Sequence, residues 1–185
     1  MNELLDYVLE FRINDILCDE IVGELQNSEW TSHEWYNSKE DYSYVTEKDP
    51  SQSFLESKNV EILRDVIWDS LLTYGEKNSP YKKEYVIKYS HPKFNRYSMG
   101  QGMDVHVDHT KSLFEPDRHG NRGIPVMSIV GLLNNDFTGG EFYMRDKELN
   151  LSKGSLLLFP SCFLFHHEVK KVISGIRYSF VTWGW

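Results

Sequence analysis

The chain has 185 residues, of which 40% are hydrophobic and 14% aromatic, and these proportions exclude extensive disorder. A single domain spanning residues 1–185 is expected at this length. The formal net charge of −8 argues against a surface that binds a nucleic-acid backbone, because such binding depends on Lys and Arg neutralising phosphates. We therefore do not expect nucleic acid as the main partner.

The first 83 residues carry helical signals and are expected to support the rest of the fold. Asn14 is placed to cap a helix that runs to about Gln26. A second helix is expected to start at Ser53 or Lys58 and to end just before Gly75. Apolar residues at helical spacing are interpreted as core-facing stripes: Ile16, Leu17, Ile21, Val22 and Leu25 in the first helix, and Ile62, Leu63, Val66, Ile67, Trp68, Leu71 and Leu72 in the second.

The segment 27–52 between the two helices is expected to form a long loop, because its apolar residues follow no clear period. It contains five aromatic residues whose polar edges suit them to gripping a substrate. Packing on the domain surface explains them equally well, and the sequence leaves both alternatives open. These residues are Trp30, Trp35, Tyr36, Tyr42 and Tyr44.

From residue 84 onward the sequence predicts short strands separated by turns, and hence a catalytic core over residues 84–185. Strands with helices only at the N-terminal end indicate an α+β, mainly β fold, most economically a jelly roll with the helices packed on its larger sheet. The predicted strands cover residues 85–89, 103–108, 124–133, 141–145, 154–159, 167–172 and 176–183.

A metal site is predicted from His106-Val107-Asp108, because residues i and i+2 of a strand point to the same face. A third ligand is offered by the pair His166-His167, 61 residues further on. Two His and one carboxylate form the facial triad that leaves open positions for O₂ and a co-substrate. A zinc hydrolase is an alternative for such a set, although it also needs an acid–base residue. Cys18 and Cys162 lack metal-binding or redox spacing and are interpreted as reduced thiols.

A buried cation is predicted at Arg177, which stands ten residues after His167 among apolar and aromatic residues. A charge is rarely placed on such a strand unless it is paired. Arg177 and Ser179 share a face by the strand period, so together they are able to hold a carboxylate. A structural salt bridge to a core acid is the competing interpretation.

Taken together, residues 97–183 resemble the catalytic core of the Fe(II)/2-oxoglutarate dioxygenases, in particular the bacterial and phage members of the prolyl 4-hydroxylase-like branch. The resemblance covers about half the chain, and the combination of motifs is more specific than any one of them. The motifs are Phe94-Asn95-Arg96-Tyr97-x-x-Gly100 followed by His106-x-Asp108; Thr138-Gly139-Gly140-Glu141-Phe142; Lys153-Gly154-x-x-Leu157-x-Phe159-Pro160; and His167-x-Val169-x-x-Val172-x-x-Gly175-x-Arg177-Tyr178-Ser179.

This resemblance implies a double-stranded β-helix, which is a jelly roll, and it implies Fe(II), 2-oxoglutarate and O₂ as cofactor and co-substrates, with ascorbate as an accessory reductant. It also implies that His106, Asp108 and His167 are the iron ligands, and its register selects His167 over His166. Arg177 would pair with the distal carboxylate of 2-oxoglutarate, and Tyr97 would hydrogen-bond to the co-substrate. Many members of the branch have Lys at the position of Arg177.

The same resemblance makes a prolyl or other side chain of a peptide or protein the leading substrate hypothesis, hydroxylated with release of succinate and CO₂. A free amino acid or small metabolite is the second hypothesis, an alkylated base the third, and a non-catalytic jelly-roll binding module the alternative from another class. Residues 27–52 and 110–123 are expected to face the substrate. The N-terminal stretch lacks a basic start and an apolar run, so we expect a soluble cytoplasmic protein, in the host cytoplasm if a phage encodes it.

Overall fold

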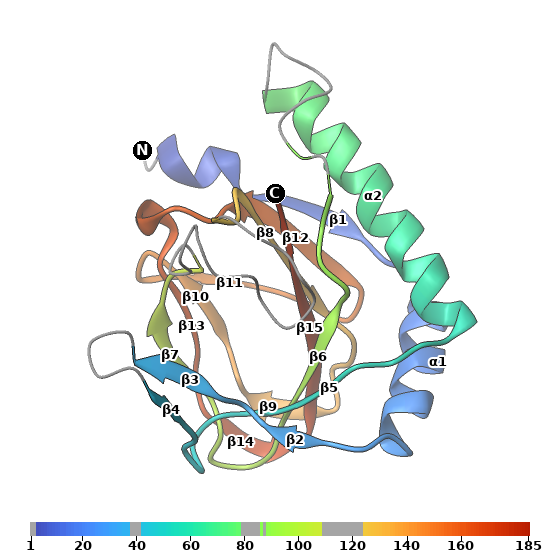
Figure 1. Ribbon diagram of the computed structural model, residues 1–185, viewed down its shortest axis with the longest axis vertical. Helices are drawn as coiled ribbons and strands as arrows, with labels where there is room; N and C mark the ends of the chain where they lie inside the picture. Colours follow the sequence, from blue (N-terminus) through green and yellow to red (C-terminus); the bar gives the residue numbers. More distant parts are fainter. Residues whose placement is uncertain (1–2, 38–41, 79–85, 87, 109–123) are drawn as a thin grey trace.

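The computed structural model describes residues 3–37, 42–78, 86, 88–108 and 124–185. It is a mainly β protein with two α-helices (Figure 1). The helices are α1 (Asp15–Gln26) and α2 (Lys58–Asn78), with short 3₁₀ helices η1 (Glu3–Tyr7) and η2 (Phe163–Phe165). The strands are β1 (Leu9–Arg12), β2 (Thr31–Ser32), β3 (Trp35–Asn37), β4 (Tyr42–Tyr44), β5 (Ser51–Ser53), β6 (Lys93–Tyr97), β7 (Met103–His106), β8 (Met127–Leu132), β9 (Phe137–Gly139), β10 (Phe142–Met144), β11 (Lys147–Leu149), β12 (Ser155–Pro160), β13 (His167–Val169), β14 (Val172–Gly175) and β15 (Arg177–Gly184).

The strands form two main sheets, as expected for a double-stranded β-helix. The larger, seven-stranded sheet has the order β1-β12-β8-β15-β6-β5-β2, and the smaller, four-stranded sheet has the order β11-β10-β13-β7. Two short pairs, β14-β9 and β3-β4, complete the β structure. All pairings between these strands are antiparallel, so the predicted jelly roll is confirmed.

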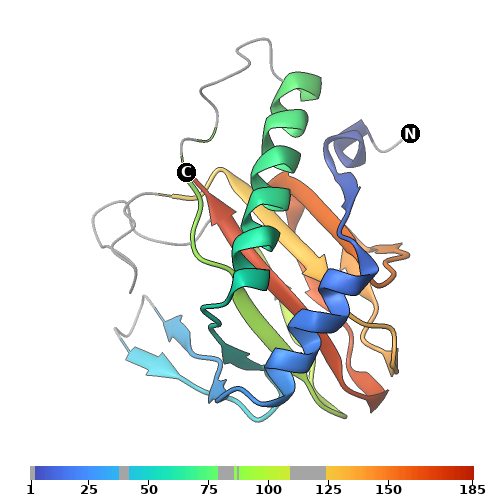
Figure 2. The ribbon, with the colours of Figure 1, turned by 90° about the vertical axis from the view of Figure 1, so that its right-hand side faces the viewer.

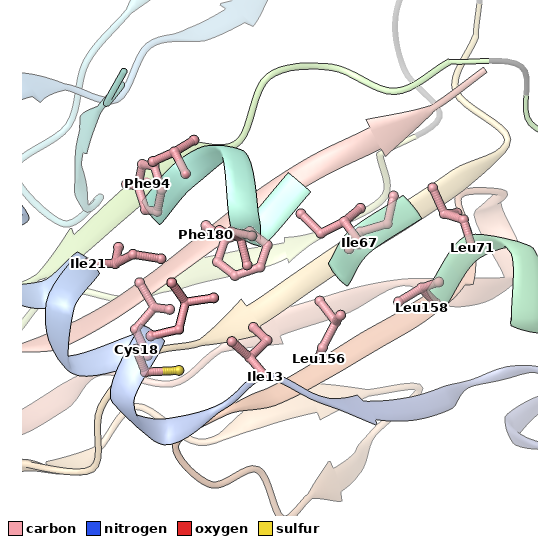
Figure 3. Close-up of a cluster of buried hydrophobic side chains, with 14 of the residues drawn as sticks. Ile13, Cys18, Ile21, Ile67, Leu71, Phe94, Leu156, Leu158 and Phe180 are labelled. Carbon is pink, nitrogen blue, oxygen red and sulfur yellow. The ribbon is translucent and has the colours of Figure 1, made fainter. Parts of the chain in front are cut away.

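Both helices lie against one face of the larger sheet (Figure 2). Helix α1 starts as predicted, because the Asn14 side chain accepts a hydrogen bond from the Ile16 amide and so satisfies one donor of the first turn. The interface is a continuous apolar core, to which the outward-facing residues of the sheet contribute Phe94 and Phe180 (Figure 3). The opposite face of the sheet is therefore left to line the interior between the two sheets.

Three residues of the predicted helical stripes are exposed in the structure: Ile16, Ile62 and Leu72. The predicted end of the second helix at Gly75 is also wrong, because α2 continues to Asn78. A glycine inside a helix costs about 1 kcal/mol relative to alanine. Gly75 and its neighbour Tyr74 are buried, and the Tyr74 hydroxyl donates to the Tyr7 carbonyl, so tertiary contacts outweigh that local cost. Neither described helix combines the length and the apolar character that a membrane crossing requires.

The predicted β structure needs three corrections, two in predicted strands and one in a segment predicted as a loop. The strand predicted at 167–172 is split, because β13 pairs with β10 and β7 whereas β14 pairs with β9. Within the strand predicted at 85–89, the described residues form only an isolated bridge, at Tyr89. The segment 27–52 contains short strands rather than a bare loop, and two of these, β2 and β5, extend the larger sheet. Trp30 packs there against Tyr178 in the core, which favours the structural interpretation of this one aromatic.

The buried thiol of Cys18 gives a first testable prediction. Burial raises its pKa to about 11, and the side chain is inaccessible to solvent, so in the native protein it should resist thiol reagents. An acid whose pKa rises on folding weakens stability as pH increases above its unfolded value of 9.0. The free energy of unfolding should therefore fall by about 1 kcal/mol per pH unit between pH 9 and 11 because of this group.

This prediction is checked by chemical denaturation across that pH range, with Cys18→Ala as the control. The variant should lose the part of the pH slope that the thiol contributes, and equal slopes in the two proteins would contradict the assignment. In the native protein, thiol labelling at pH 8 should be confined to the half-buried Cys162.

Candidate metal centre and carboxylate clamp

The structure brings together the three residues of the predicted metal site. His106 ends β7 and His167 begins β13, and these two residues are directly opposed partners in the smaller sheet. Asp108 follows two residues after the end of β7. The antiparallel pairing of β7 with β13 therefore places two imidazoles from distant segments side by side, which the spacing in the sequence alone does not reveal.

The ligand-type atoms of these residues converge closely. The Asp108 carboxylate lies 3.9 Å from Nε2 of His106 and 3.8 Å from Nε2 of His167, and the two imidazole centroids are 4.3 Å apart. One ligand atom from each residue can be chosen so that all three lie within 4.8 Å of one another. No other such group of His, Cys, Asp and Glu occurs within the described part of the chain.

Both imidazoles are held in the orientation that a metal requires. Nδ1 of His106 donates to the Asp104 carbonyl at 2.8 Å, and Nδ1 of His167 donates to the Phe165 carbonyl at 3.0 Å. Since a carbonyl is only an acceptor, the ring proton sits on Nδ1, and Nε2, the atom nearer Asp108 in each ring, is the one that would bind a metal. Burial, and then the neighbouring His167, lower the pKa of His106, which favours the neutral imidazole that binds metals. The residues therefore fit a divalent metal ion.

Aromatic side chains fix the His167 ring. Phe142 stacks on it at a centroid distance of 5.5 Å, and Phe159 contacts it edge-on at 5.2 Å. His167 is only 5% exposed as a result. Offset and edge-to-face contacts of this kind restrict ring rotation and exclude water.

Asp108 is held by a pair of buried serines that the sequence analysis did not single out. The Ser128 hydroxyl donates to Asp108 Oδ2 at 2.6 Å, and the Ser128 and Ser161 hydroxyl oxygens are 2.8 Å apart. Both serines are almost fully buried, at 0% and 2% exposure. Serine is common and follows no diagnostic spacing here, so only the fold reveals the pair.

Arg177 begins β15 and is the largest fully buried side chain that the structure describes, at 1% exposure. Its Nε donates to the Gly140 carbonyl at 3.2 Å and its Nη1 to the Ser179 hydroxyl at 2.8 Å. Among the described residues no carboxylate lies within ion-pair distance of the guanidinium. The alternative of a structural salt bridge within the core is therefore not supported there.

Tyr97 completes this arrangement, which we call the carboxylate clamp: Arg177, Ser179 and Tyr97. Tyr97 is the direct cross-strand partner of Arg177, and the guanidinium carbon lies 5.0 Å from its ring centroid. Burial raises the pKa of Tyr97, so its hydroxyl stays protonated and able to donate. Burial also lowers the pKa of Arg177, the sign of a cation short of compensating charge.

Open space adjoins the clamp. A cavity of about 170 Å³ is bordered by Arg177, Phe142, Leu132 and Gly140, so one wall carries the buried cation and another the ring that stacks on His167. On the same face of β6 as Tyr97, Asn95 lies opposite Ser179 and has a buried amide oxygen without a described hydrogen-bond partner. The sequence indicated Asn95 only as part of a motif. Its buried amide oxygen without a described partner makes it an additional candidate for contact with a ligand.

Gly140 gives a second prediction, because its backbone has φ +67° and a Cβ there would lie 3.0 Å from Cδ of Arg177 and 3.2 Å from Cγ2 of Val172. Gly140→Ala should therefore strain the loop by about 1–2 kcal/mol and push Arg177 out of position. We expect a lower melting temperature together with weaker 2-oxoglutarate binding, measured by calorimetric titration. Gly23→Ala on α1 is the matched control, since nothing lies within 4 Å of its added methyl group, and it should leave binding unchanged.

His166 is not part of the group of converging ligand atoms, although it lines the same surface depression as its neighbour His167. It is half-buried and borders a surface depression with Val105, Tyr143 and Arg145, and it is not among the converging ligand atoms. The expected substrate-facing segment 110–123 lies outside the described residues. In the other expected segment, Tyr42 and Tyr44 are exposed with their rings 5.8 Å apart, whereas the side chains of Trp35 and Tyr36 lie outside the described part.

A family model described as the 2OG-Fe(II) oxygenase superfamily matches residues 92–185, which include the whole metal centre and the whole clamp. The chain belongs to this superfamily. The resemblance to the Fe(II)/2-oxoglutarate dioxygenases that the sequence motifs indicated is thereby confirmed. A non-catalytic binding module is accordingly not the interpretation that we retain.

Curated relatives agree with this family. A PKHD-type hydroxylase of Psychrobacter sp. (strain PRwf-1) is 36% identical over 98 residues, which are 50% of this chain and 36% of the relative. The PKHD-type hydroxylase PiuC of Pseudomonas aeruginosa is 30% identical over 105 residues, 52% of this chain and 44% of that protein. The matched stretch thus spans less than half the length of these relatives.

Solved structures share the fold over nearly the whole chain. A prolyl-4-hydroxylase of Pseudomonas putida superimposes with a TM-score of 0.70 at 15% identity, covering 98% of this chain and 96% of that one. The viral collagen prolyl hydroxylase of Paramecium bursaria Chlorella virus-1, in its 2OG complex, gives a TM-score of 0.66 at 16% identity, covering 96% and 94%. A Trichoplax adhaerens prolyl hydroxylase, solved with a hypoxia inducible factor peptide fragment, gives 0.68 at 16%, covering 99% and 86%. At these identities the likeness establishes the double-stranded β-helix and nothing finer.

Proposed function

We propose that this oxygenase holds one Fe(II) ion through His106, Asp108 and His167, and hydroxylates a C–H bond of a peptide or protein side chain, proline foremost. The observation that carries the proposal is the convergence of the two opposed histidines and Asp108, whose ligand atoms lie within 4.8 Å of one another. A buried arginine without a described acidic partner supports a dicarboxylate co-substrate. When bound, iron and 2-oxoglutarate activate O₂, so that one oxygen atom enters the substrate and the other is incorporated as 2-oxoglutarate becomes succinate and CO₂.

The residues of the chain contribute binding and orientation. Three protein ligands on one side of a metal leave its remaining positions to exogenous ligands. Arg177 and Ser179 hold the distal carboxylate of 2-oxoglutarate, with the Tyr97 hydroxyl as a further donor. Because the guanidinium is buried, its attraction for a carboxylate is screened less than at a surface.

The protein also excludes water from the chemistry. Phe142 and Phe159 cover the His167 ring, and Arg177 is closed off from solvent. No general base is required of the chain, because the cofactor and co-substrate carry the chemistry and the protein supplies position and surroundings.

A peptide substrate is favoured over a free amino acid by one observation. The exposed tyrosines of β4 offer an open aromatic surface rather than a closed pocket. Extended apolar and aromatic surface suits a chain that lies across the site more than a small metabolite that must be enclosed.

The substrate proposal is tested with a library of proline-containing and proline-free peptides, incubated with the protein, Fe(II), 2-oxoglutarate and O₂. We expect a mass gain of one oxygen in proline-containing members, accompanied by at least an equal amount of succinate. The His167→Ala variant is the control and should modify none of them. Oxidation of free amino acids but of no peptide would overturn the peptide proposal while leaving the metal centre intact.

A further inference from the structure

The two buried serines behind Asp108 form a directed hydrogen-bond chain. Ser128 has a single hydroxyl proton, and that proton is donated to Asp108 Oδ2 at 2.6 Å. In the 2.8 Å contact with Ser161, Ser128 must therefore accept and Ser161 must donate. Each bond polarises the next toward the carboxylate, and the 2.6 Å length of the Ser128–Asp108 bond is that of a charge-assisted bond between a hydroxyl and a carboxylate.

The position of the chain in the fold gives it a second connection. Ser128 lies on β8, in the interior-facing row of the larger sheet, whereas Ser161 directly follows β12 and precedes η2. The Ser161 amide donates to the Val126 carbonyl at 3.0 Å, which ties the two segments together at this point. Helix η2 ends at Phe165, whose carbonyl accepts from Nδ1 of His167 at 3.0 Å. The segment held by Ser161 is thus the same segment that orients the His167 imidazole.

We infer that Ser128 and Ser161 are positioning residues of the metal centre, which fix the plane of the Asp108 carboxylate and link it to the His167 segment. This inference rests on the proposed metal site. Without the hydroxyl of Ser128, the carboxylate would lose its described hydrogen-bond donor and could rotate away from the two imidazoles. Outer-shell partners of this kind typically alter metal affinity by roughly 10–100-fold when they are removed.

The test uses Mn²⁺, which is stable in air, as the probe, with the whole chain of 185 residues. Its dissociation constant is measured by calorimetric titration for the wild type, Ser128→Ala, Ser161→Ala and the double variant, and Co²⁺ absorption spectra report the coordination. Ser128→Ala should weaken Mn²⁺ binding by roughly 10–100-fold and shift the Co²⁺ spectrum. Ser161→Ala should weaken binding less, and the double variant should bind no worse than Ser128→Ala alone, because Ser161 acts through Ser128.

Ser155 provides a matched control. It is also 0% exposed on the larger sheet and also hydrogen-bonds a carboxylate, that of Glu10, but it begins β12, whereas Phe159, the cross-strand partner of Ser128, lies near the other end of that strand. Ser155→Ala should lower the melting temperature of the metal-free protein as much as Ser128→Ala does, and should leave Mn²⁺ affinity and the Co²⁺ spectrum unchanged. If all three serine variants lost Mn²⁺ affinity only in proportion to their loss of melting temperature, Ser128 and Ser161 would have a merely structural role.

The outcomes separate this inference from the proposed function. Wild-type protein that binds Mn²⁺ no better than His167→Ala would overturn the metal centre itself, and the positioning role with it. Wild-type protein that binds Mn²⁺ through His167, with Ser128→Ala binding equally well, would overturn the positioning role alone.

Discussion

Replacement of His167 by alanine is expected to abolish divalent metal binding and all turnover of 2-oxoglutarate, whereas replacement of His166 by alanine should leave both nearly unchanged. The physical reason is that, of these two adjacent histidines, only His167 belongs to the converging ligand atoms, with 3.8 Å between its Nε2 and the Asp108 carboxylate. Removing one of three ligands should cost more than the roughly 10–100-fold that the loss of an outer-shell hydrogen bond costs.

Calorimetric titration of Mn²⁺ into the two variants measures this effect, and the melting temperature of each metal-free variant shows whether it is folded. His167 packs between Phe142 and Phe159, so some loss of stability is expected in His167→Ala. Metal binding that survives His167→Ala but is lost in His166→Ala would reverse the assignment of the ligand.

The second large effect is expected at Arg177. In Arg177→Leu the apparent affinity for 2-oxoglutarate should fall roughly 30-fold or more, because truncating one partner of a buried charge pair costs about 2–5 kcal/mol. Metal affinity in the absence of 2-oxoglutarate should stay within about 2-fold of the wild type, because Arg177 is not among the converging ligand atoms.

The thermal stability of ligand-free Arg177→Leu should not fall, in contrast to its affinity for 2-oxoglutarate. Arg177 is a buried cation without an acidic partner among the described residues, so replacing it by leucine removes a desolvation cost from the ligand-free protein. The melting temperature of the ligand-free variant should be equal to or higher than that of the wild type, whereas stabilisation by added 2-oxoglutarate should disappear. A marked drop in ligand-free stability with unchanged 2-oxoglutarate binding would show that Arg177 is a structural residue.

The two helices show which features of the fold could be predicted from the sequence. The start and end of helix α1 were predictable, since Asn14 is a local capping signal and the apolar spacing is local as well, although Ile16 of the predicted stripe is exposed. The end of α2 was not, because burial of Tyr74 and Gly75 depends on contacts with residues near the N-terminus. Strand β1 was missed for a similar reason: its partner is β12, where Leu9 lies opposite Leu158. The pairing of strands that are far apart in the sequence cannot be predicted from a few neighbouring residues.

The candidate site divides in the same way. His106, Asp108, His167 and Arg177 were identified because their residue types and spacings are rare in combination. Ser128 and Ser161 could not be identified in this way, since only the fold shows that they are buried and hydrogen-bonded behind Asp108. Asn95 occupies an intermediate position, because it belongs to a motif, but its buried and orphaned amide oxygen is visible only in the folded chain.

Formation of succinate from 2-oxoglutarate, followed by NMR in the presence of Fe(II) and O₂, tests the central claim most directly. The wild-type protein should form succinate even without a substrate, more slowly than with a cognate peptide, and both rates should vanish in His167→Ala and on removal of Fe(II). The His166→Ala variant should retain them. Succinate formation that is independent of Fe(II), or equal in the wild type and His167→Ala, would contradict an oxygenase centre built from His106, Asp108 and His167.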